Sequence, residues 1–201
     1  MNKYKITDLK EFLYGKEGTA FSPEEKFEII ANNYMNYKTL NYCNNEYRIV
    51  ECEFYYNDKN AHADIYTHGS DEQYTCGKWY DHYSGLDITI GNNELGICGG
   101  ILIRGIYSKK INDFINGPLK LKHELSFNLC DVDQSKQINI PFFTDDIHWK
   151  TNDDKIYRTK RQGLTVTKSG QEDFINRAYR FIIKEIDGKI NPLYKKLPKQ
   201  D

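Results

Sequence analysis

The stretch RIVECEFYY, residues 48–56, decides how the rest of the chain is read. Its β-branched and aromatic residues predict a β-strand. Glu51 and Glu53 lie two positions apart in this strand, so their side chains point to the same side, while Cys52 and Phe54 point the other way, toward the expected core. Two interpretations of the carboxylates stay open. Either both carboxylates face solvent, as most strand carboxylates do, or one of them lies in a pocket and acts as a general base.

Further along the chain, the sequence predicts more strands. LDITIG (86–91) alternates polar and apolar residues, and GGILIRGIYS (99–108) is an apolar run of the kind found in central strands. Residues 139–146 and 155–167 also read as extended segments. The run at 178–186 suits a strand or a helix, because periodicity does not separate the two in so short a segment.

Helix signals occur between these strands. In SPEEKF, which begins at Ser22, the serine is an N-cap, the proline suits the first helical position, and Glu25 closes a capping box. Short helices are also expected at 108–116 and 119–127, whereas residues 57–76 read as a long loop. A chain of 201 residues with this mixture of elements predicts a single α+β domain.

Composition indicates a folded protein, because aromatic residues make up 14% of the chain, with 16 Tyr, and disordered chains are poor in them. The net charge of −1 is unevenly spread. Residues 1–149 carry 15 Lys and Arg against 22 Asp and Glu, whereas residues 150–201 carry 13 against 7. The basic last quarter is either a surface that binds a polyanion or an ordinary solvated surface. Charge alone favours the ordinary solvated surface.

Several function classes lack their sequence signals. The five cysteines are odd in number and form no CxxC pair, which favours thiols in a reducing cytoplasm over a disulfide framework. No apolar segment suits a signal peptide or a membrane span. The histidines lack the spacing of a zinc site, and G-x-S-x-G, P-loop and G-x-G-x-x-G motifs are missing. We therefore expect no metal site, no serine hydrolase or nucleotide-dependent enzyme, and no membrane contact.

Arg104 interrupts the apolar strand ILIRGI. It is either paired with a carboxylate at the edge of the core, or held under a pocket where it orients an acid or grips a phosphate.

Together, the motifs resemble those of the alkyladenine (3-methyladenine, or N-methylpurine) DNA glycosylase family. In chain order they are RIVECEFY at 48–55, NAHAD around His62, KWYDHYSG at 78–85, GGILIRGI at 99–106, NGPLKL at 116–121, RQGLT at 161–165 and AYRF at 178–181. Leu119 stands where the family has a small residue and Tyr179 where it has Trp. The chain is also not basic overall, as duplex-binding proteins usually are.

The resemblance implies a curved, mostly antiparallel β-sheet with flanking helices. Its core spans residues 47–181, after an N-terminal helical segment at 1–46 and before a basic tail at 182–201. It also implies a monomeric, monofunctional DNA glycosylase that excises a flipped, modified purine without a cofactor. Glu53 would activate the attacking water, and Arg104 would lie beside it.

The remaining site residues follow from the same resemblance. The base pocket would contain Tyr55, His62, Tyr80, His82 and Tyr83, and phosphates would contact Lys120, Lys160, Arg161 and Lys168. His82 and Asp87 depart from the family pattern and would reshape the pocket for another modified base, a single strand or RNA. Two alternatives stay open: a base-binding module without catalysis, and a hydrolase of another N-glycoside, such as a nucleoside or a modified RNA.

Overall fold

The computed structural model describes residues 6–16, 18–126, 140–145, 155–166 and 172–197. Its α-helices are α1 (Leu9–Tyr14), α2 (Pro23–Asn36), α3 (Pro118–Ser126) and α4 (Glu172–Asn176). Short 3₁₀ helices are η1 (Gly18–Ala20), η2 (Asp71–Tyr74) and η3 (Tyr194–Lys196). The strands are β1 (Thr39–Tyr42), β2 (Asn45–Asp58), β3 (His62–Ala63), β4 (Cys76–His82), β5 (Gly85–Ile90), β6 (Cys98–Ser108), β7 (Asp113–Asn116), β8 (Phe142–Thr144), β9 (Ile156–Thr159), β10 (Arg180–Ile183), β11 (Glu185–Ile186) and β12 (Lys189–Ile190).

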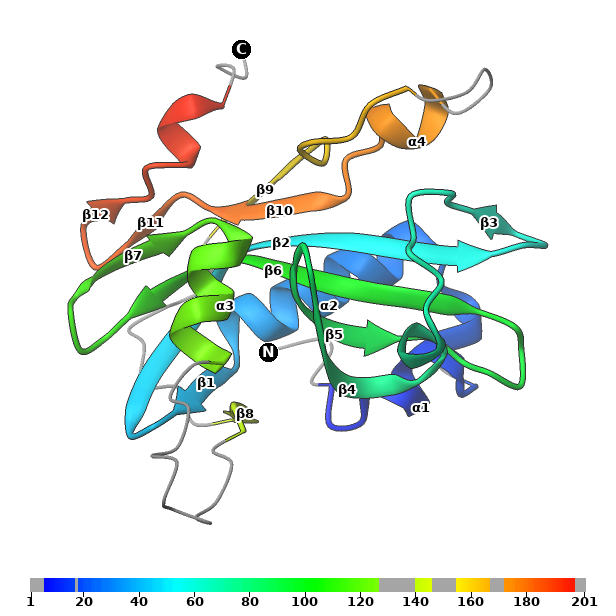
Figure 1. The fold of residues 1–201 in the computed structure, drawn as a ribbon, viewed down its shortest axis with the longest axis horizontal. Coiled ribbons are helices and arrows are strands. Elements are labelled where there is room, and N and C mark those ends of the chain that lie inside the picture. Colours follow the sequence, from blue (N-terminus) through cyan, green and yellow to red (C-terminus); the bar gives the residue numbers. More distant parts are fainter. Residues whose placement is uncertain (1–5, 17, 127–139, 146–154, 167–171, 198–201) are drawn as a thin grey trace.

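The centre of the fold is β2, which contains the stretch at 48–56. On one side β2 pairs with β6 along most of its length, and on the other side it pairs in turn with β1, β10 and β3. The main path of this sheet is β4-β5-β6-β2-β1-β8, and its pairings among the described residues are antiparallel. The sheet curls, and Figure 1 shows α2 crossing behind β2 and β6 while α3 lies in front of them. The predicted single α+β domain with a curved antiparallel sheet is confirmed.

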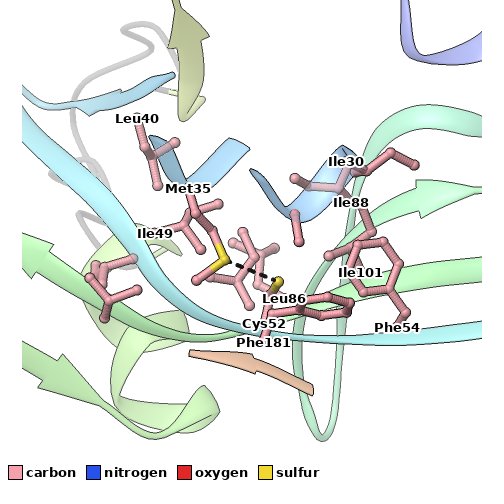
Figure 2. Close-up of a cluster of buried hydrophobic side chains, with 14 of the residues drawn as sticks. Ile30, Met35, Leu40, Ile49, Cys52, Phe54, Leu86, Ile88, Ile101 and Phe181 are labelled. Atoms are coloured by element: carbon pink, nitrogen blue, oxygen red, sulfur yellow. Dashed lines mark hydrogen bonds between the residues drawn. The ribbon is translucent and has the colours of Figure 1, made fainter. Parts of the chain in front are cut away.

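One face of β2 packs on α2 and forms the apolar core. The Phe54 ring stacks on Phe27 of α2 with ring centroids 4.7 Å apart, and Phe181 of β10 meets it edge-on at 5.3 Å. The sulfur of Cys52 lies 3.9 Å from that of Met35, as Figure 2 shows. Cys52 and Phe54 therefore face the core, as the alternation predicts.

The start of α2 has the predicted cap. The Ser22 hydroxyl accepts a hydrogen bond from the Glu25 N–H at 3.3 Å, and the Glu25 carboxylate accepts one from the Ser22 N–H at 2.8 Å. This reciprocal pair satisfies two N–H groups that have no partner within the helix.

Several predicted elements differ from the structure. The helix expected at 108–116 is wrong, because β6 continues to Ser108 and turns back as β7, with Asn112 at φ +54° in the turn. The ring of Phe114 packs on Tyr107 across this hairpin at 5.0 Å, which a helix would prevent. The N-terminal segment at 1–46 is not wholly helical either, since β1 lies within it.

Other predictions hold where the chain is described. The helix expected at 119–127 is present as α3, and the ambiguous run at 178–186 contains β10 and β11. Between the end of β2 and the start of β4 at Cys76, the segment expected as a loop at 57–76 contains β3 and η2 as regular elements. None of the described helices combines the length and the apolar character that crossing a membrane requires.

Candidate active site

The face of β2 opposite α2 borders a cavity of about 360 Å³. This size lies within the range of small-molecule sites. Residues from β2, β4, β5, β6, the start of α3, the β4–β5 turn and two loops line it. They are Tyr55, Tyr66, His68, His82, Ser84, Asp87, Leu102, Arg104, Pro118, Gln162, Gly163 and Leu164.

Glu53 lies directly behind two of these lining residues. Its Oε2 accepts hydrogen bonds from the Tyr55 hydroxyl at 2.9 Å and from Nη1 of Arg104 at 3.2 Å, and its Oε1 accepts one from the backbone N–H of Gln162 at 2.8 Å. The Glu53 side chain has no exposed area. Its carboxylate is therefore one hydrogen bond away from the cavity rather than part of the cavity wall.

Burial raises the pKa of Glu53 above its ordinary value. The Arg104 guanidinium, the Gln162 N–H and the Tyr55 hydroxyl oppose this rise by stabilising the carboxylate, but burial outweighs them. A carboxyl group with a raised pKa beside a cavity is a candidate for proton transfer.

Glu51 shares this ionic environment. Its Oε1 accepts from Nε of Arg104 at 3.1 Å and from Nε of Arg180 at 2.6 Å. The two guanidinium groups come from β6 and β10, the strands that flank β2 at this point. Neither carboxylate faces solvent, so the first interpretation of the strand carboxylates is wrong, and Arg104 is close to both of them.

Arg161 does not lie on the surface as a phosphate contact, so this prediction is wrong. Its guanidinium is buried and forms two hydrogen bonds with the carboxylate of buried Asp64, at 2.5 and 3.1 Å. It also lies over the rings of Tyr55 at 4.6 Å and Tyr66 at 5.6 Å, measured to the ring centroids. Arg161 therefore fixes two aromatic walls of the cavity from behind.

The opposite wall contains a His82–Asp87 pair. Nε2 of His82 lies 3.0 Å from Oδ1 of buried Asp87, and Nδ1 accepts from the Ser84 N–H at 3.2 Å. The His82 ring also stacks on Tyr80 with ring centroids 4.9 Å apart. Asp87 packs against Gly100, where an added Cβ would lie 2.4 Å from its Oδ2.

Some predicted site residues are not brought to the cavity. His62 is buried on the α2 side, where Nδ1 lies 2.8 Å from the Tyr56 carbonyl oxygen and Nε2 lies 2.7 Å from the Tyr179 hydroxyl. It packs edge-on against Phe27, so the prediction that it contacts the base is not supported by its position. Tyr83 is 95% exposed in the β4–β5 turn.

The other predicted residues lie as follows. Tyr80 supports His82 from outside the cavity lining. Lys120 and Lys160 are exposed, as phosphate contacts require, and Lys168 lies outside the described residues.

Sequence reasoning missed Tyr66, His68 and Gln162. Tyr66 and His68 lie in a segment that only reads as a loop, and nothing in its pattern points to the cavity. Gln162 lies within the quoted RQGLT motif, but its role depends on a backbone N–H, which any residue except proline supplies. Among the described residues, no three His, Cys, Asp or Glu side chains are grouped as a metal site.

Comparison with known proteins gives one relative to report and no family. No family model matches the chain. The chain is 26% identical, over an alignment of 191 residues, to uncharacterized protein L759 of Acanthamoeba polyphaga mimivirus, and the match covers 80% of this chain and 87% of that protein. The similarity therefore extends over most of both chains and carries no functional information.

Proposed function

We propose that the protein hydrolyses the N-glycosidic bond of a modified purine that is flipped out of DNA into the cavity. The observation that carries this proposal is the position of buried Glu53 behind Tyr55 and Arg104, both of which line the cavity. A purine base needs flat aromatic walls on which it can stack, and polar groups that form hydrogen bonds with its edge. Tyr55 and Tyr66 supply the aromatic walls, and the Gln162 side chain supplies a polar group for the edge of the base.

The hydrogen bond between Tyr55 and Glu53 suggests how the carboxylate acts from behind the wall. Water attacks C1′ of the sugar, the C1′–N bond breaks, and the base leaves with the bonding electrons. The water proton passes to the Tyr55 oxygen while the Tyr55 hydroxyl proton passes to Oε2 of Glu53. Burial and the Glu53 carboxylate raise the pKa of Tyr55, so its hydroxyl is protonated before the reaction, as this relay requires.

The chemistry of alkylated purines suits this site. Alkylation at a ring nitrogen makes the base cationic, and a cation is attracted to the faces of tyrosine rings. The same charge makes the base a good leaving group, because it departs neutral. A modest catalyst without a metal or a cofactor therefore suffices.

The proposal implies DNA as the partner, a monomer as the acting form and the cytoplasm as the compartment. Cys43, Cys52, Cys76 and Cys98 are free thiols, which suits a reducing compartment. Lys120 and Lys160 would contact phosphates, so binding to duplex DNA should weaken steeply as salt rises. A flat salt response would count against a DNA-bound state.

A base-release assay on alkylated duplex DNA tests the role of Glu53. We expect Glu53→Gln to lower the rate by about 100- to 10,000-fold, the usual contribution of a general base. Glu51→Gln is the matched control, because Glu51 belongs to the same buried ionic group but does not contact Tyr55. Full activity of folded Glu53→Gln, or equal losses in both variants, would reject the assignment.

The relay has its own pair of variants. Tyr55→Phe keeps the ring but removes the hydroxyl between Glu53 and the cavity, and we expect a loss of about tenfold or more. Tyr66→Phe is the control, because its hydroxyl donates to the Thr165 carbonyl oxygen instead. If both variants release base at the wild-type rate, the proton does not travel through Tyr55.

The burial of Glu53 also favours a second candidate, a base-binding module without catalysis. The hydrogen bonds of its carboxylate are internal, and its side chain has no exposed area. The module predicts binding without base release from alkylated duplexes, single strands, modified RNA or nucleosides. Release from only one of these substrates would instead identify the N-glycoside that is cleaved.

A further inference from the structure

A second hollow adjoins the cavity along the segment 162–164. It has a volume of about 550 Å³, and both hollows are lined by Gln162, Gly163 and Leu164. We call it the basic groove, because Lys160, Arg161, Arg180 and Lys196 line it and none of the described residues in its lining is acidic.

Arg180 is the unusual residue of this groove. Its side chain is only 3% exposed, and Nε donates to Oε1 of Glu51 at 2.6 Å. Its two terminal nitrogens form no hydrogen bond with any described residue. A guanidinium carries five N–H donors, and Arg180 lines the groove, so its terminal nitrogens can donate to an acceptor that enters the groove.

Arg161 also lines the groove but is held internally. Nε of Arg161 is buried and has no hydrogen-bond partner, although its terminal nitrogens are held by Asp64. The exposed ammonium groups of Lys160 and Lys196 flank the groove. The terminal nitrogens of Arg180 and the two exposed ammonium groups therefore form a cationic site for an anion with several oxygens.

We propose that the basic groove binds a phosphate group through the free terminal nitrogens of Arg180. The planar guanidinium fork matches phosphate oxygens in pairs. The bond from Nε to Glu51 sets the direction of the fork before the ligand arrives. Lys160 and Lys196 close over the remaining oxygens as charges on flexible stems.

The position of the groove beside the cavity also indicates which larger ligand would carry the phosphate. A nucleotide whose base occupies the cavity would cross the segment 162–164, and its phosphate would enter the groove. This step rests on the proposed function, whereas the phosphate site itself does not. It predicts that phosphorylated nucleotides and oligonucleotides, rather than free nucleosides, are the ligands of the joined hollows.

Calorimetric titration with inorganic phosphate tests the site without any substrate turnover. We expect wild-type protein to bind phosphate and Arg180→Lys to bind it about tenfold more weakly, because lysine keeps the charge beside Glu51 but loses the fork. Lys196→Ala should also weaken binding. The control is Lys195→Ala, an exposed neighbour in η3 that does not line the groove. No binding to wild type, or an equal loss in Lys195→Ala, would overturn the site.

A second titration separates this inference from the proposed function. Glu53→Gln, which should not release base, is titrated with a short single-stranded DNA and with the matching nucleoside. We expect the oligonucleotide to bind more tightly, and Arg180→Lys to remove that advantage. If phosphate binds but the oligonucleotide gains nothing over phosphate, the nucleotide assignment fails while the phosphate site stands. Absence of base release with phosphate binding intact rejects only the proposed function.

Discussion

The two faces of β2 are both buried, but they are buried in different ways. The face toward α2 carries Cys52 and Phe54, which pack against Met35, Phe27 and other apolar groups. The cavity face carries Glu51 and Glu53, which are held by two guanidiniums from the neighbouring strands. A strand can fold with only one of these two kinds of contact, apolar packing or ionic pairing.

The difference separates stability from function. Burial of apolar surface stabilises the fold directly. A buried ionic group costs desolvation that its own attraction repays only in part, so apolar residues of similar volume often serve stability equally well or better. The ionic face therefore has its explanation in the cavity it borders, and the following predictions test this contrast.

The largest effect is expected on the α2 face. Phe54→Ala removes a ring held between Phe27 and Phe181, and should lower the free energy of unfolding by about 3–5 kcal/mol. Denaturant titration measures it. Phe142→Ala is the control, because Phe142 is 57% exposed, and it should change stability by no more than about 0.5 kcal/mol. Similar small losses in both variants would show that Phe54 is not part of a tightly packed core.

On the cavity face, a single variant and a double variant are expected to differ in their free energies of unfolding. Arg180→Met leaves Glu51 without one of its two guanidiniums and should cost about 3 kcal/mol of unfolding free energy. Adding Glu51→Met removes the carboxylate as well, so the double variant should recover most of that loss. A double-mutant cycle in denaturant measures both. If the double variant is as unstable as the two losses added together, the ionic face is needed for stability, and the contrast between the faces fails.

The sequence was sufficient for the parts of this contrast that depend on local patterns. Alternation along 48–56 places Glu51 and Glu53 on one side and Phe54 on the other, and the capping box locates the start of α2. These features depend on residues a few positions apart, so they survive whatever the rest of the chain does.

The partners of the acids depend on strand pairing across long separations. Arg180 meets Glu51 only because β10 pairs with β2 in the register Arg180–Glu53 and Ile182–Glu51, and the motif AYRF does not contain that register. The same reason explains Arg161. Its charge suggests a surface contact, but its guanidinium pairs with the carboxylate of buried Asp64, 97 positions away. The segment 108–116 is expected to be a short helix from its local pattern, but pairing of β7 with β6 makes it a hairpin instead.

A pH series sharpens the contrast at Glu53. Because burial raises the pKa of Glu53, the folded protein holds this proton more tightly than the unfolded chain does. The stabilising contribution is therefore present below the ordinary glutamate value of about 4.3 and is lost as pH rises through the raised value. We expect the unfolding free energy of the wild type, relative to Glu53→Gln, to fall as pH rises from about 4 toward neutrality.

Glu25 supplies a control of opposite sign. The Ser22 N–H lowers the pKa of Glu25, so its contribution is present above the ordinary value and is lost as pH falls through the lowered one. The wild type, relative to Glu25→Gln, should therefore gain stability as pH rises. Denaturant titrations across this pH range measure both differences. The same sign for both variants would mean that Glu53 is not desolvated as the structure shows.

The smallest effect concerns the cap that positions α2 under the apolar face. Ser22→Ala removes the hydroxyl that accepts the Glu25 N–H and should lower the unfolding free energy by about 1 kcal/mol. Ser70→Ala is the matched control, because Ser70 occupies the N-cap of η2 without a capping hydrogen bond from its side chain. Its effect should stay within about 0.5 kcal/mol. Equal losses would mean that the hydroxyl at Ser22 contributes no more than a serine without a capping bond, and that α2 is held in place by its packing on the apolar face of β2 rather than by this hydroxyl.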